Sequence, residues 1–464
     1  MRSAMTTICV IGASTGWTPT LATDLMSVFD EPLEVRLVDI NPEASALCAE
    51  WGNTAQRHFP CGHRFIPFAD RREALKGADA VIVTISTGGL DAMSYDIAIP
   101  EKYGIFATVG DTAGPGGWSR ALRNIPVFRQ FAEDFQTICP KAIIANYTNP
   151  MAALTATLQL CCGNPVVGLC HAYFETKDVI QKMFGLSDWS QISVSIAGMN
   201  HFTWVVDFKV GREDGYRLLR ERIGGGSIRD LLPRKSKDEI NLWTGHDLCA
   251  EMFEAFGYLP YPADRHISEF VSFALCGQPG RFLMDTNKGQ CDTIEYCRIK
   301  RTSIEHRRRM LAGRDEGLRQ WIAEDRACEA RREDNPRKPK RSRETGAEMI
   351  RAYLKNKPFV DAVNTLNVGQ IAGLPLGACV ETMGVVDGMG VRPVQAASVP
   401  EPLLEVMRPG AVCQKWTVDA ALKGDRELAI QALLRDPQCS HLKPHEVRAM
   451  AGELLEANRA WTRL

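Results

Sequence analysis

A glycine-rich turn follows the first apolar, strand-like run of the chain. The turn Gly12–Gly16 (Gly-Ala-Ser-Thr-Gly) closes the run Ile8–Ala13 and precedes a stretch of helical spacing. Such a turn lets a pyrophosphate approach backbone amides at a helix N-terminus, where the helix dipole and free N–H groups favour an anion. Ser14 stands where the second glycine of the usual dinucleotide-binding pattern would be. We therefore expect Gly12, Ser14 and Thr15 to contact a nucleotide cofactor.

An acidic residue ends the second strand-like run. Asp39 lies close to the separation of about 20 residues expected for a carboxylate that binds the ribose hydroxyls. A carboxylate there would repel the 2′-phosphate of NADP, so NAD is favoured. The alternative for Asp39 is an ordinary aspartate at a strand end. We also expect Asn146, at the end of a later run, to contact the cofactor; at this point a lactate- or malate-dehydrogenase-like enzyme remains open.

Alternating strands and helices must position these residues. In the first third of the chain, apolar β-branched runs alternate with amphipathic stretches of helical period. Such βαβ units predict an α/β fold with a parallel, Rossmann-type sheet and right-handed crossovers. The expected strands are Ile8–Ala13, Leu33–Asp39, Ala80–Ser86, Ala142–Asn146, Pro165–Cys170 and Ile192–Gly198, and the expected helices are Thr20–Phe29, Pro42–Phe59 and Ile125–Cys139.

The alternation breaks up past about residue 200, and Gly224–Gly226 predicts a loop. We therefore predict two domains. Residues 1–200 form a Rossmann-like domain that binds NAD, and residues 201–464 form a mixed α+β domain that completes the site.

Composition excludes several classes of protein. Among 464 residues, 55 Lys and Arg face 56 Asp and Glu, and the net charge of −1 argues against nucleic acid or an anionic membrane as partner. No apolar run approaches the roughly 18 residues of a membrane span. Met1–Thr7 leads directly into the first strand, so we expect no signal peptide and a cytoplasmic enzyme. The fifteen cysteines include no C-x-x-C pair and are expected to be mostly buried thiols.

Residues 305–344 are dense in charge. Arginine runs such as Arg307–Arg309 suggest a nucleic-acid arm, but interspersed Asp and Glu residues offset much of the positive charge. Apolar residues at helical spacing, including Leu318, Trp321 and Ile322, favour a solvated helix followed by an exposed loop.

Four short segments carry a family resemblance. They are Gly110–Gly117, Asn146–Met151, Gly168–His171 and Gly198–His201. In this order and spacing they resemble glycoside hydrolase family 4, whose members are NAD- and metal-dependent glycosidases related in fold to lactate and malate dehydrogenases. The likeness continues through Arg120–Pro126, Ala263–Phe270 and Val363–Gly369.

The resemblance implies a route of glycoside hydrolysis that does not use two carboxylates. NAD takes a hydride from C3 of the sugar, a base removes the acidified C2 proton, the glycosidic oxygen leaves by elimination, water adds, and the hydride returns. A divalent cation on the C2 and C3 oxygens acts as a Lewis acid. The cofactor is regenerated in each turnover, so no NAD is consumed.

The resemblance also implies a metal site. Cys170 and His201 match the family's metal ligands, for which manganese is the usual ion. Each follows an apolar strand, so the two can meet at the carboxyl edge of a sheet. The alternatives are a buried cysteine and a core histidine. His171, which we expect to be catalytic, follows the metal-binding cysteine as in members that act on unphosphorylated α-glycosides.

Other site residues follow from the same likeness. Asp264 falls where many members place a tyrosine base; we expect it to take the C2 proton, with a metal-shell or ion-pairing role as the alternative. Asn149 matches a substrate-contacting position, or else forms an Asx-turn before Pro150. Asn200 binds a sugar hydroxyl or orients its strand, and Arg281 could pair with a C6 carboxylate.

The substrate expectation is an unphosphorylated α-hexuronide, a galacturonide or glucuronide, because Ala172–Glu175 is more similar to uronide-cleaving members. An α-glucosidase or α-galactosidase of the same family, an NAD-dependent 2-hydroxyacid dehydrogenase and a catalytically silent NAD-binding sensor are the alternatives. We expect a homodimer or homotetramer with a small carbohydrate as its substrate.

Overall fold

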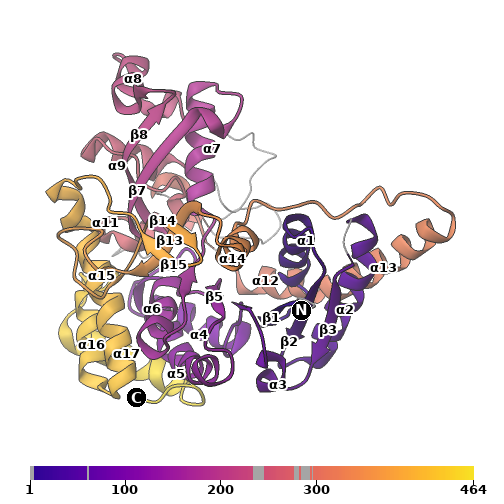
Figure 1. Ribbon diagram of the computed structural model, residues 1–464. Coiled ribbons are helices and arrows are strands. Elements are labelled where there is room, and N and C mark those ends of the chain that lie inside the picture. The colour runs from indigo at the N-terminus through magenta and orange to yellow at the C-terminus, as the bar shows by residue number, and fades with distance from the viewer. Residues whose placement is uncertain are drawn as a thin grey trace.

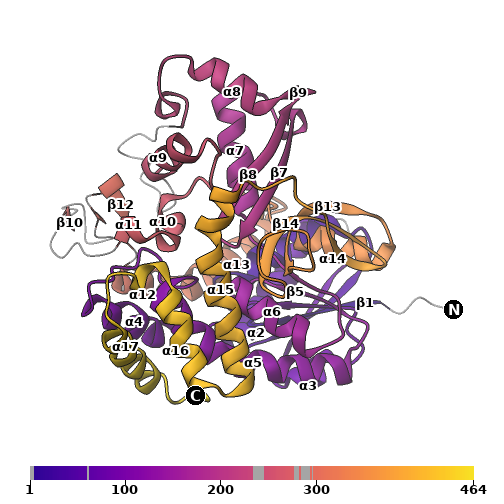
Figure 2. The same ribbon diagram turned by 90° about the vertical axis from the view of Figure 1, so that its left-hand side faces the viewer.

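The structure is a computed structural model (Figures 1 and 2) that describes residues 5–59, 62–233, 245–275, 282–283, 293–294, 296–301 and 303–464. Its centre is a twelve-stranded mixed sheet. Six neighbouring strands of this sheet are parallel, and they are, in spatial order, β3 (Arg64–Phe68), β2 (Leu33–Val38), β1 (Thr6–Ile11), β4 (Ala80–Val83), β5 (Ile143–Asn146) and β6 (Val166–Gly168). This strand order is that of dinucleotide-binding α/β domains, which confirms the predicted fold class.

Helices connect these strands. They are α1 (Thr18–Val28), α2 (Pro42–Ala55), α3 (Arg71–Leu75), α4 (Gly89–Glu101), α5 (Gly114–Ile138), α6 (Met151–Cys161) and α7 (Ala172–Phe184). The predicted strands of this region and the three predicted helices are confirmed, although α5 begins well before the expected Ile125.

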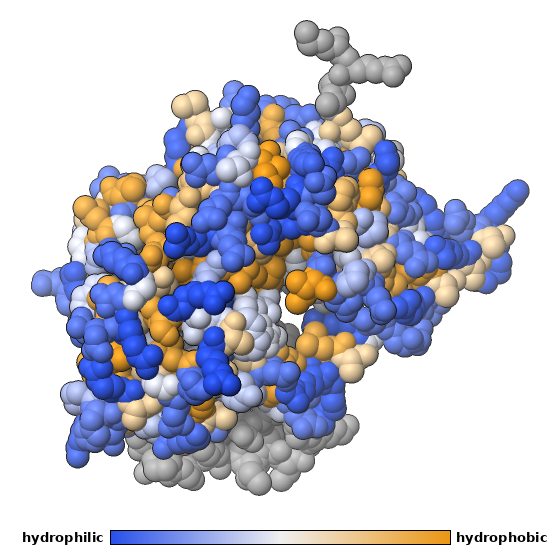
Figure 3. Space-filling view, turned by 90° about the horizontal axis from the view of Figure 1, so that it is seen from below, coloured by the Kyte–Doolittle hydropathy of each residue, from blue (hydrophilic) through white to orange (hydrophobic). Residues whose placement is uncertain are grey.

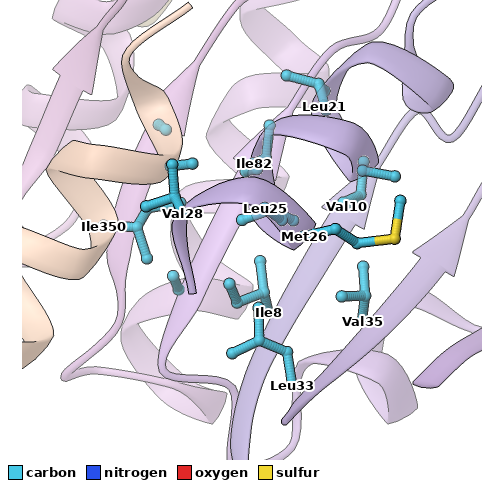
Figure 4. Close-up of a cluster of buried hydrophobic side chains, with 14 of the residues drawn as sticks. Ile8, Val10, Leu21, Leu25, Met26, Val28, Leu33, Val35, Ile82 and Ile350 are labelled. Atoms are coloured by element: carbon cyan, nitrogen blue, oxygen red, sulfur yellow. The ribbon is translucent and has the colours of Figure 1, made fainter. Parts of the chain in front are cut away.

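The parallel sheet is buried on both faces. Along β1, Ile8 and Val10 belong to one apolar cluster, whereas Cys9 and Ile11 belong to the other. Side chains alternate between the two faces of a strand, so a strand covered on both sides reads as a continuous apolar run. Figure 4 shows the first cluster, where Leu25 of α1 lies over the strands of the sheet.

The second half of the chain extends the same sheet. Beyond β6 the order continues with β13 (Phe359–Leu366), β14 (Cys379–Asp387), β7 (Ile192–Met199), β8 (Phe202–Val210) and β9 (Glu213–Asp214), while β15 (Gly390–Pro393) pairs with β14. Three two-residue strands form a separate small sheet, β10 (Phe282–Leu283), β11 (Thr293–Ile294) and β12 (Ile299–Lys300). The predicted boundary at residue 200 falls in the turn of the β7–β8 hairpin, so the sheet does not divide at that residue.

The remaining helices surround this extension. They are α8 (Gly215–Ile223), α9 (Asp247–Phe256), α10 (Asp264–Ile267), α11 (Ser272–Leu275), α14 (Gly346–Lys355), α15 (Glu401–Lys423), α16 (Arg426–Arg435) and α17 (Pro444–Ala457). Figure 2 shows α15 beside α16, with α17 next to α16. None of the described helices is long and apolar enough to cross a membrane.

The charged stretch forms two helices, α12 (Ile304–Ala312) and α13 (Arg314–Ala330). Helix α13 packs against α2, where Trp321 contacts Trp51 with ring centroids 5.4 Å apart. Asp325 is fully buried and pairs with Arg57 at 2.5 Å. The far end of α13 projects at the right of Figure 3, where hydrophilic side chains predominate. The predicted solvated helix is therefore confirmed, with one face docked on the nucleotide-binding half.

Candidate active site

The predicted phosphate-binding turn lies at the end of β1. Gly12 has a φ of +93°, and a Cβ there would meet the carbonyl oxygen of Thr84 at 2.0 Å. Only glycine fits this position. The N–H groups of Gly12 and Ala13 both donate to the carbonyl of Val38, which joins the turn to the end of β2. The hydroxyl of Thr15 donates to Asp315 at 2.5 Å.

The two other predicted cofactor residues differ in their surroundings. Asp39 follows β2 beside this turn, half-buried, and its Oδ1 accepts the Asn41 N–H at 2.8 Å. Burial raises the pKa of Asp39. Asn146 is fully buried at the end of β5, and its amide bonds the backbone of Thr148 and the hydroxyl of Thr155. The Asn146 side chain therefore shapes a turn, and a cofactor contact by it stays a prediction.

His201 lies in the two-residue turn between β7 and β8, only 4% exposed and with a φ of +67°. A positive φ is uncommon outside glycine and often marks a functional position. Its Nδ1 lies 3.0 Å from the hydroxyl of Thr112, and that hydroxyl donates to Asp111 at 2.7 Å. A hydroxyl has one proton, so Nδ1–H must donate to Thr112, which leaves Nε2 unprotonated.

The charges around this chain of hydrogen bonds support the same assignment. Burial lowers the pKa of His201 to about 4 and keeps the imidazole neutral. Burial alone would raise the pKa of Asp111, but the charges of Arg120 and Arg307 and the hydrogen bond from Thr112 hold it below its usual value. A neutral imidazole oriented through its second nitrogen is the usual state of a metal-binding histidine.

Glu269 holds the segment that carries Asp111 and Thr112. Its Oε1 accepts the N–H groups of Thr108, Val109 and Gly110 at 2.9, 2.7 and 2.8 Å. The carboxyl group is 1% exposed, and burial raises its pKa to about 7. One buried side chain therefore fixes the backbone that orients His201.

Cys170 lies two residues after β6, near a set of buried oxygens. Burial and the charge of Glu381 on β14 raise the pKa of the Cys170 thiol, whereas a hydrogen bond from Asn200 lowers it. Asn200 Oδ1 and Glu381 Oε1 are buried and have no hydrogen-bond partner among the described residues. Unpartnered buried oxygens are costly unless a ligand satisfies them.

These residues fit a divalent cation. Cys170 supplies sulfur and His201 supplies nitrogen, and the unpartnered oxygens beside them suit a hydroxylated ligand. The described part of the chain contains no cluster of three or more metal-ligating side chains. Two protein ligands would leave coordination positions for substrate oxygens, as the family resemblance implies.

His171 stands at the edge of this site. Its side chain is 38% exposed and precedes α7, with ring nitrogens 3.9 Å from Glu175 and 3.7 Å from Glu344. Beside it, His201 and His266 lie with their ring centroids 4.0 Å apart, and burial lowers the pKa of both. The structure thus brings His171 to the site, and its catalytic role stays a prediction.

Tyr261 also belongs to the site, although the sequence analysis did not identify it. Its ring is 1% exposed and stacks on that of His201 at 6.4 Å between centroids. Its hydroxyl donates to Glu175 at 2.5 Å. Burial and the charges of Glu175 and Cys170 raise the pKa of this phenol well above its usual value.

Asp264 is engaged elsewhere. Its two carboxylate oxygens accept the N–H groups of Leu248 and Cys249, both at 2.9 Å, at the start of α9. Burial raises the pKa of Asp264 to about 7. A carboxylate in this position satisfies orphan amides of a helix N-terminus. This capping role competes with the expected role as base, and catalysis by Asp264 stays a prediction.

Asn149 lies beside Asp111. Its side-chain nitrogen Nδ2 is 3.5 Å from Asp111 Oδ2, and its backbone carbonyl accepts the Arg120 Nε–H at 3.0 Å. The structure therefore brings Asn149 to the same group of residues as His201. Arg281, the predicted partner of a substrate carboxylate, lies outside the described residues.

Arg307 of α12 is a cation within electrostatic reach of this group, and its Nη1 lies 3.6 Å from Met93 Sδ. Its charge acts on Asp111, Arg120 and His266. The next two arginines pair with carboxylates, Arg308 with Asp91 and Arg309 with Glu305. No such ion pair is formed by Arg307 within the described ranges. A half-buried cation beside the site suits an anionic group of a ligand.

Sequence signals for the residues that were missed are weak. Glu381 is an acidic residue inside the apolar run of β14, which is a usable signal of function. Asp111 and Thr112 fall within a segment that carried the family resemblance, but nothing local distinguishes their roles. Tyr261 and Glu269 have no local signal, because their partners are 86 and about 160 positions away in the chain.

Comparisons with known proteins are consistent with this geometry. A sequence model of the family 4 glycosyl hydrolases matches residues 7–186, and that of the family 4 C-terminal domain matches residues 196–439. An α-galacturonidase of Bacillus subtilis is 31% identical over 92% of this chain and 91% of its own length. An α-galactosidase of the same organism is 30% identical over 92% of both chains.

Solved structures share the fold. The crystal structure of the lplD protein of Bacillus subtilis has 28% identity and a TM-score of 0.85, covering 97% of this chain and 100% of that one. A 6-phospho-α-glucosidase from gut microorganisms, in complex with NAD and Mn²⁺, has 20% identity and a TM-score of 0.75 over 99% of both chains.

Proposed function

Because this chain belongs to glycosyl hydrolase family 4, we propose that it hydrolyses α-hexuronides, using NAD and a divalent cation, Mn²⁺. The observation that carries the proposal is the hydrogen-bonded chain from Asp111 through Thr112 to His201, which leaves Nε2 of a neutral imidazole unprotonated. Tyr261 stacks on this imidazole and also lies within the electrostatic reach of Cys170. A simple dehydrogenase on this fold has no need of a cysteine and histidine paired in this way.

The protein's own residues would hold both groups. Cys170 and His201 would bind the cation, and the turn at Gly12 with Asp39 would bind NAD. When bound, the cation supplies Lewis acidity and NAD supplies reversible oxidation at C3 of the sugar. The unpartnered oxygens of Asn200 and Glu381 would accept hydrogen bonds from sugar hydroxyls.

Removal of the C2 proton needs a base, for which the chain offers two candidates. Tyr261 can accept this proton as its own hydroxyl proton passes to Glu175, because the two are already hydrogen-bonded. The Glu175 side chain is 23% exposed, so it can release the proton to solvent. Asp264 would first have to give up two backbone hydrogen bonds.

The two candidate substrates differ in whether the sugar carries a negative charge at C6. The α-galacturonidase relative at 31% identity favours a hexuronide, and the α-galactosidase relative at 30% favours a neutral α-galactoside as the second candidate. Arg307 supports the hexuronide, because its guanidinium could pair with a C6 carboxylate near Asp111.

Turnover in D₂O tests the route. The enzyme, supplied with NAD and Mn²⁺, would be given nitrophenyl α-galacturonide, α-glucuronide and α-galactoside. We expect deuterium at C2 of the released sugar, no accumulation of NADH and the fastest hydrolysis for a uronide. Product without deuterium at C2 would reject the elimination route, and stoichiometric NADH would indicate a dehydrogenase.

Two variants locate the base in the same assay. Tyr261→Phe should slow hydrolysis and deuterium incorporation together, because the phenyl ring cannot take a proton. Asp264→Asn should mainly reduce stability if Asp264 only caps α9. The opposite pattern would assign the base to Asp264, as the sequence predicts.

A further inference from the structure

The start of α13 lies directly on the predicted phosphate-binding turn. A Cβ added to Gly16 would meet the Arg314 guanidinium, with Nη1 at 2.1 Å and Cζ at 3.2 Å. The guanidinium therefore occupies the space that any side chain at position 16 would need. Because glycine has no side chain, it leaves room at this position for the Arg314 guanidinium.

A hydrogen bond fixes this arrangement. The Thr15 hydroxyl donates to Asp315 Oδ1 at 2.5 Å, which ties the first turn of α13 to the turn after β1. The hydroxyl of Thr15 is consequently engaged within the protein. At this turn α13 therefore places the Asp315 carboxylate on the Thr15 hydroxyl and the Arg314 guanidinium beside Gly16.

Within the part of the chain that the structure describes, Arg314 has no counter-ion at this place. Other arginines of the same segment are paired, such as Arg308 with Asp91 and Arg326 with Glu50 at 3.0 Å. Arg314 forms no ion pair or hydrogen bond with any residue that the structure describes. A guanidinium matches the geometry of phosphate oxygens and binds them with charge-assisted hydrogen bonds.

We propose that Arg314 binds the pyrophosphate of the dinucleotide, so that the helix pair 304–330 completes the cofactor site from outside the parallel sheet. This inference rests on the proposed use of NAD. It gives the charged stretch a function, because its docking on α2 places one cation at the phosphates. Ser14, in place of the second glycine of the usual pattern, is compatible with such a phosphate contact from α13.

Binding of nucleotides to the full-length protein tests the inference without turnover. Calorimetry would give Kd values for NAD, ADP and adenosine with the wild type and with Arg314→Ala. We expect NAD and ADP to bind about 10- to 100-fold more weakly to the variant, because charge-assisted hydrogen bonds are lost. Adenosine should bind both proteins equally, since it carries no phosphate. Arg319→Ala is the matched control, an exposed arginine on the same helix without an ion pair within the described ranges, and should leave all three values unchanged.

A double-mutant cycle with Gly16→Ala separates a local contact from a folding effect. A methyl group at position 16 should displace the guanidinium, and should weaken NAD binding in the wild-type background. In the Arg314→Ala background the same change should have little further effect, because there is no guanidinium left to displace.

The outcomes that overturn the inference are distinct. A Kd for NAD within twofold of wild type in Arg314→Ala would reject the phosphate contact and leave the proposed function standing. Equal weakening of NAD and adenosine would show that Arg314 only supports the fold. Failure of the wild type to bind NAD at all would reject the proposed function, and this inference with it.

Discussion

Replacement of Glu269 by alanine should destabilise the protein and disable the site together. The carboxyl group accepts three backbone N–H groups, those of Thr108, Val109 and Gly110, in a region without solvent access. Each orphaned buried amide costs about 1–3 kcal/mol, so we expect a loss of at least about 3 kcal/mol in the free energy of unfolding. The segment that orients His201 through Thr112 would loosen, and kcat should fall.

Urea unfolding followed by tryptophan fluorescence measures the first effect, and Glu269→Gln provides the control. Glutamine presents one carbonyl oxygen to the same three amides, so its stability near pH 6 should lie within about 1.5 kcal/mol of wild type. Glu269→Ala with a stability within 1 kcal/mol of wild type, or with unchanged kcat, would refute the reasoning.

The pH dependence of the free energy of unfolding, compared between the wild type and Glu269→Gln, gives an independent check. Burial raises the pKa of Glu269 from 4.5 to about 7, so the folded state favours the protonated carboxyl group. The stability that this group contributes is complete below about pH 4.5 and is lost as the pH rises through 7. Between about pH 4.5 and pH 7, the free energy of unfolding of the wild type should fall by about 3 kcal/mol relative to that of Glu269→Gln. A difference that does not change with pH would contradict the assignment.

Three further predictions concern the ligands. Asp39→Ala should relax the preference for NAD over NADP, measured as the ratio of the two Kd values, because repulsion of the 2′-phosphate is removed; an unchanged ratio would place Asp39 away from the ribose. Cys170→Ser should weaken Mn²⁺ binding at least about 10-fold, measured by electron paramagnetic resonance, and should abolish hydrolysis without altering NAD affinity. Full activity of this variant in chelator-treated buffer would defeat the metal assignment. Arg307→Ala should lower kcat/KM for α-galacturonide by about 10-fold or more while leaving α-galactoside hydrolysis unchanged, and equal losses on both substrates would remove Arg307 from carboxylate recognition.

Local patterns were sufficient for the elements and for part of the site. The buried strands β1, β2, β4 and β5 read as apolar runs because helices cover both faces of the sheet. Gly12 was identifiable because a turn between a strand and a helix requires its backbone conformation. Helix α5 was recognised only in its second half, because the glycines and proline of its first turn are typical of loops.

The continuation of the sheet and several roles needed the tertiary structure. β13 and β14 are separated from β6 by almost 200 residues, yet they continue its sheet, and local alternation could not place them there. The role of Asp264 also depends on distant packing, since its carboxylate meets a helix start that precedes it in the chain.

The sequence by itself determined the class of fold, and it predicted the phosphate-binding turn and, through the family resemblance, the thiol and imidazole that could hold a metal. The tertiary structure alone decided which protons and charges act on them. Thr112 reaches His201 across 89 positions, and Asp315 reaches Thr15 across 300. Strand and helix patterns arise from interactions between near neighbours in the chain, whereas these partners meet only after the sheet has formed and distant elements pack upon it.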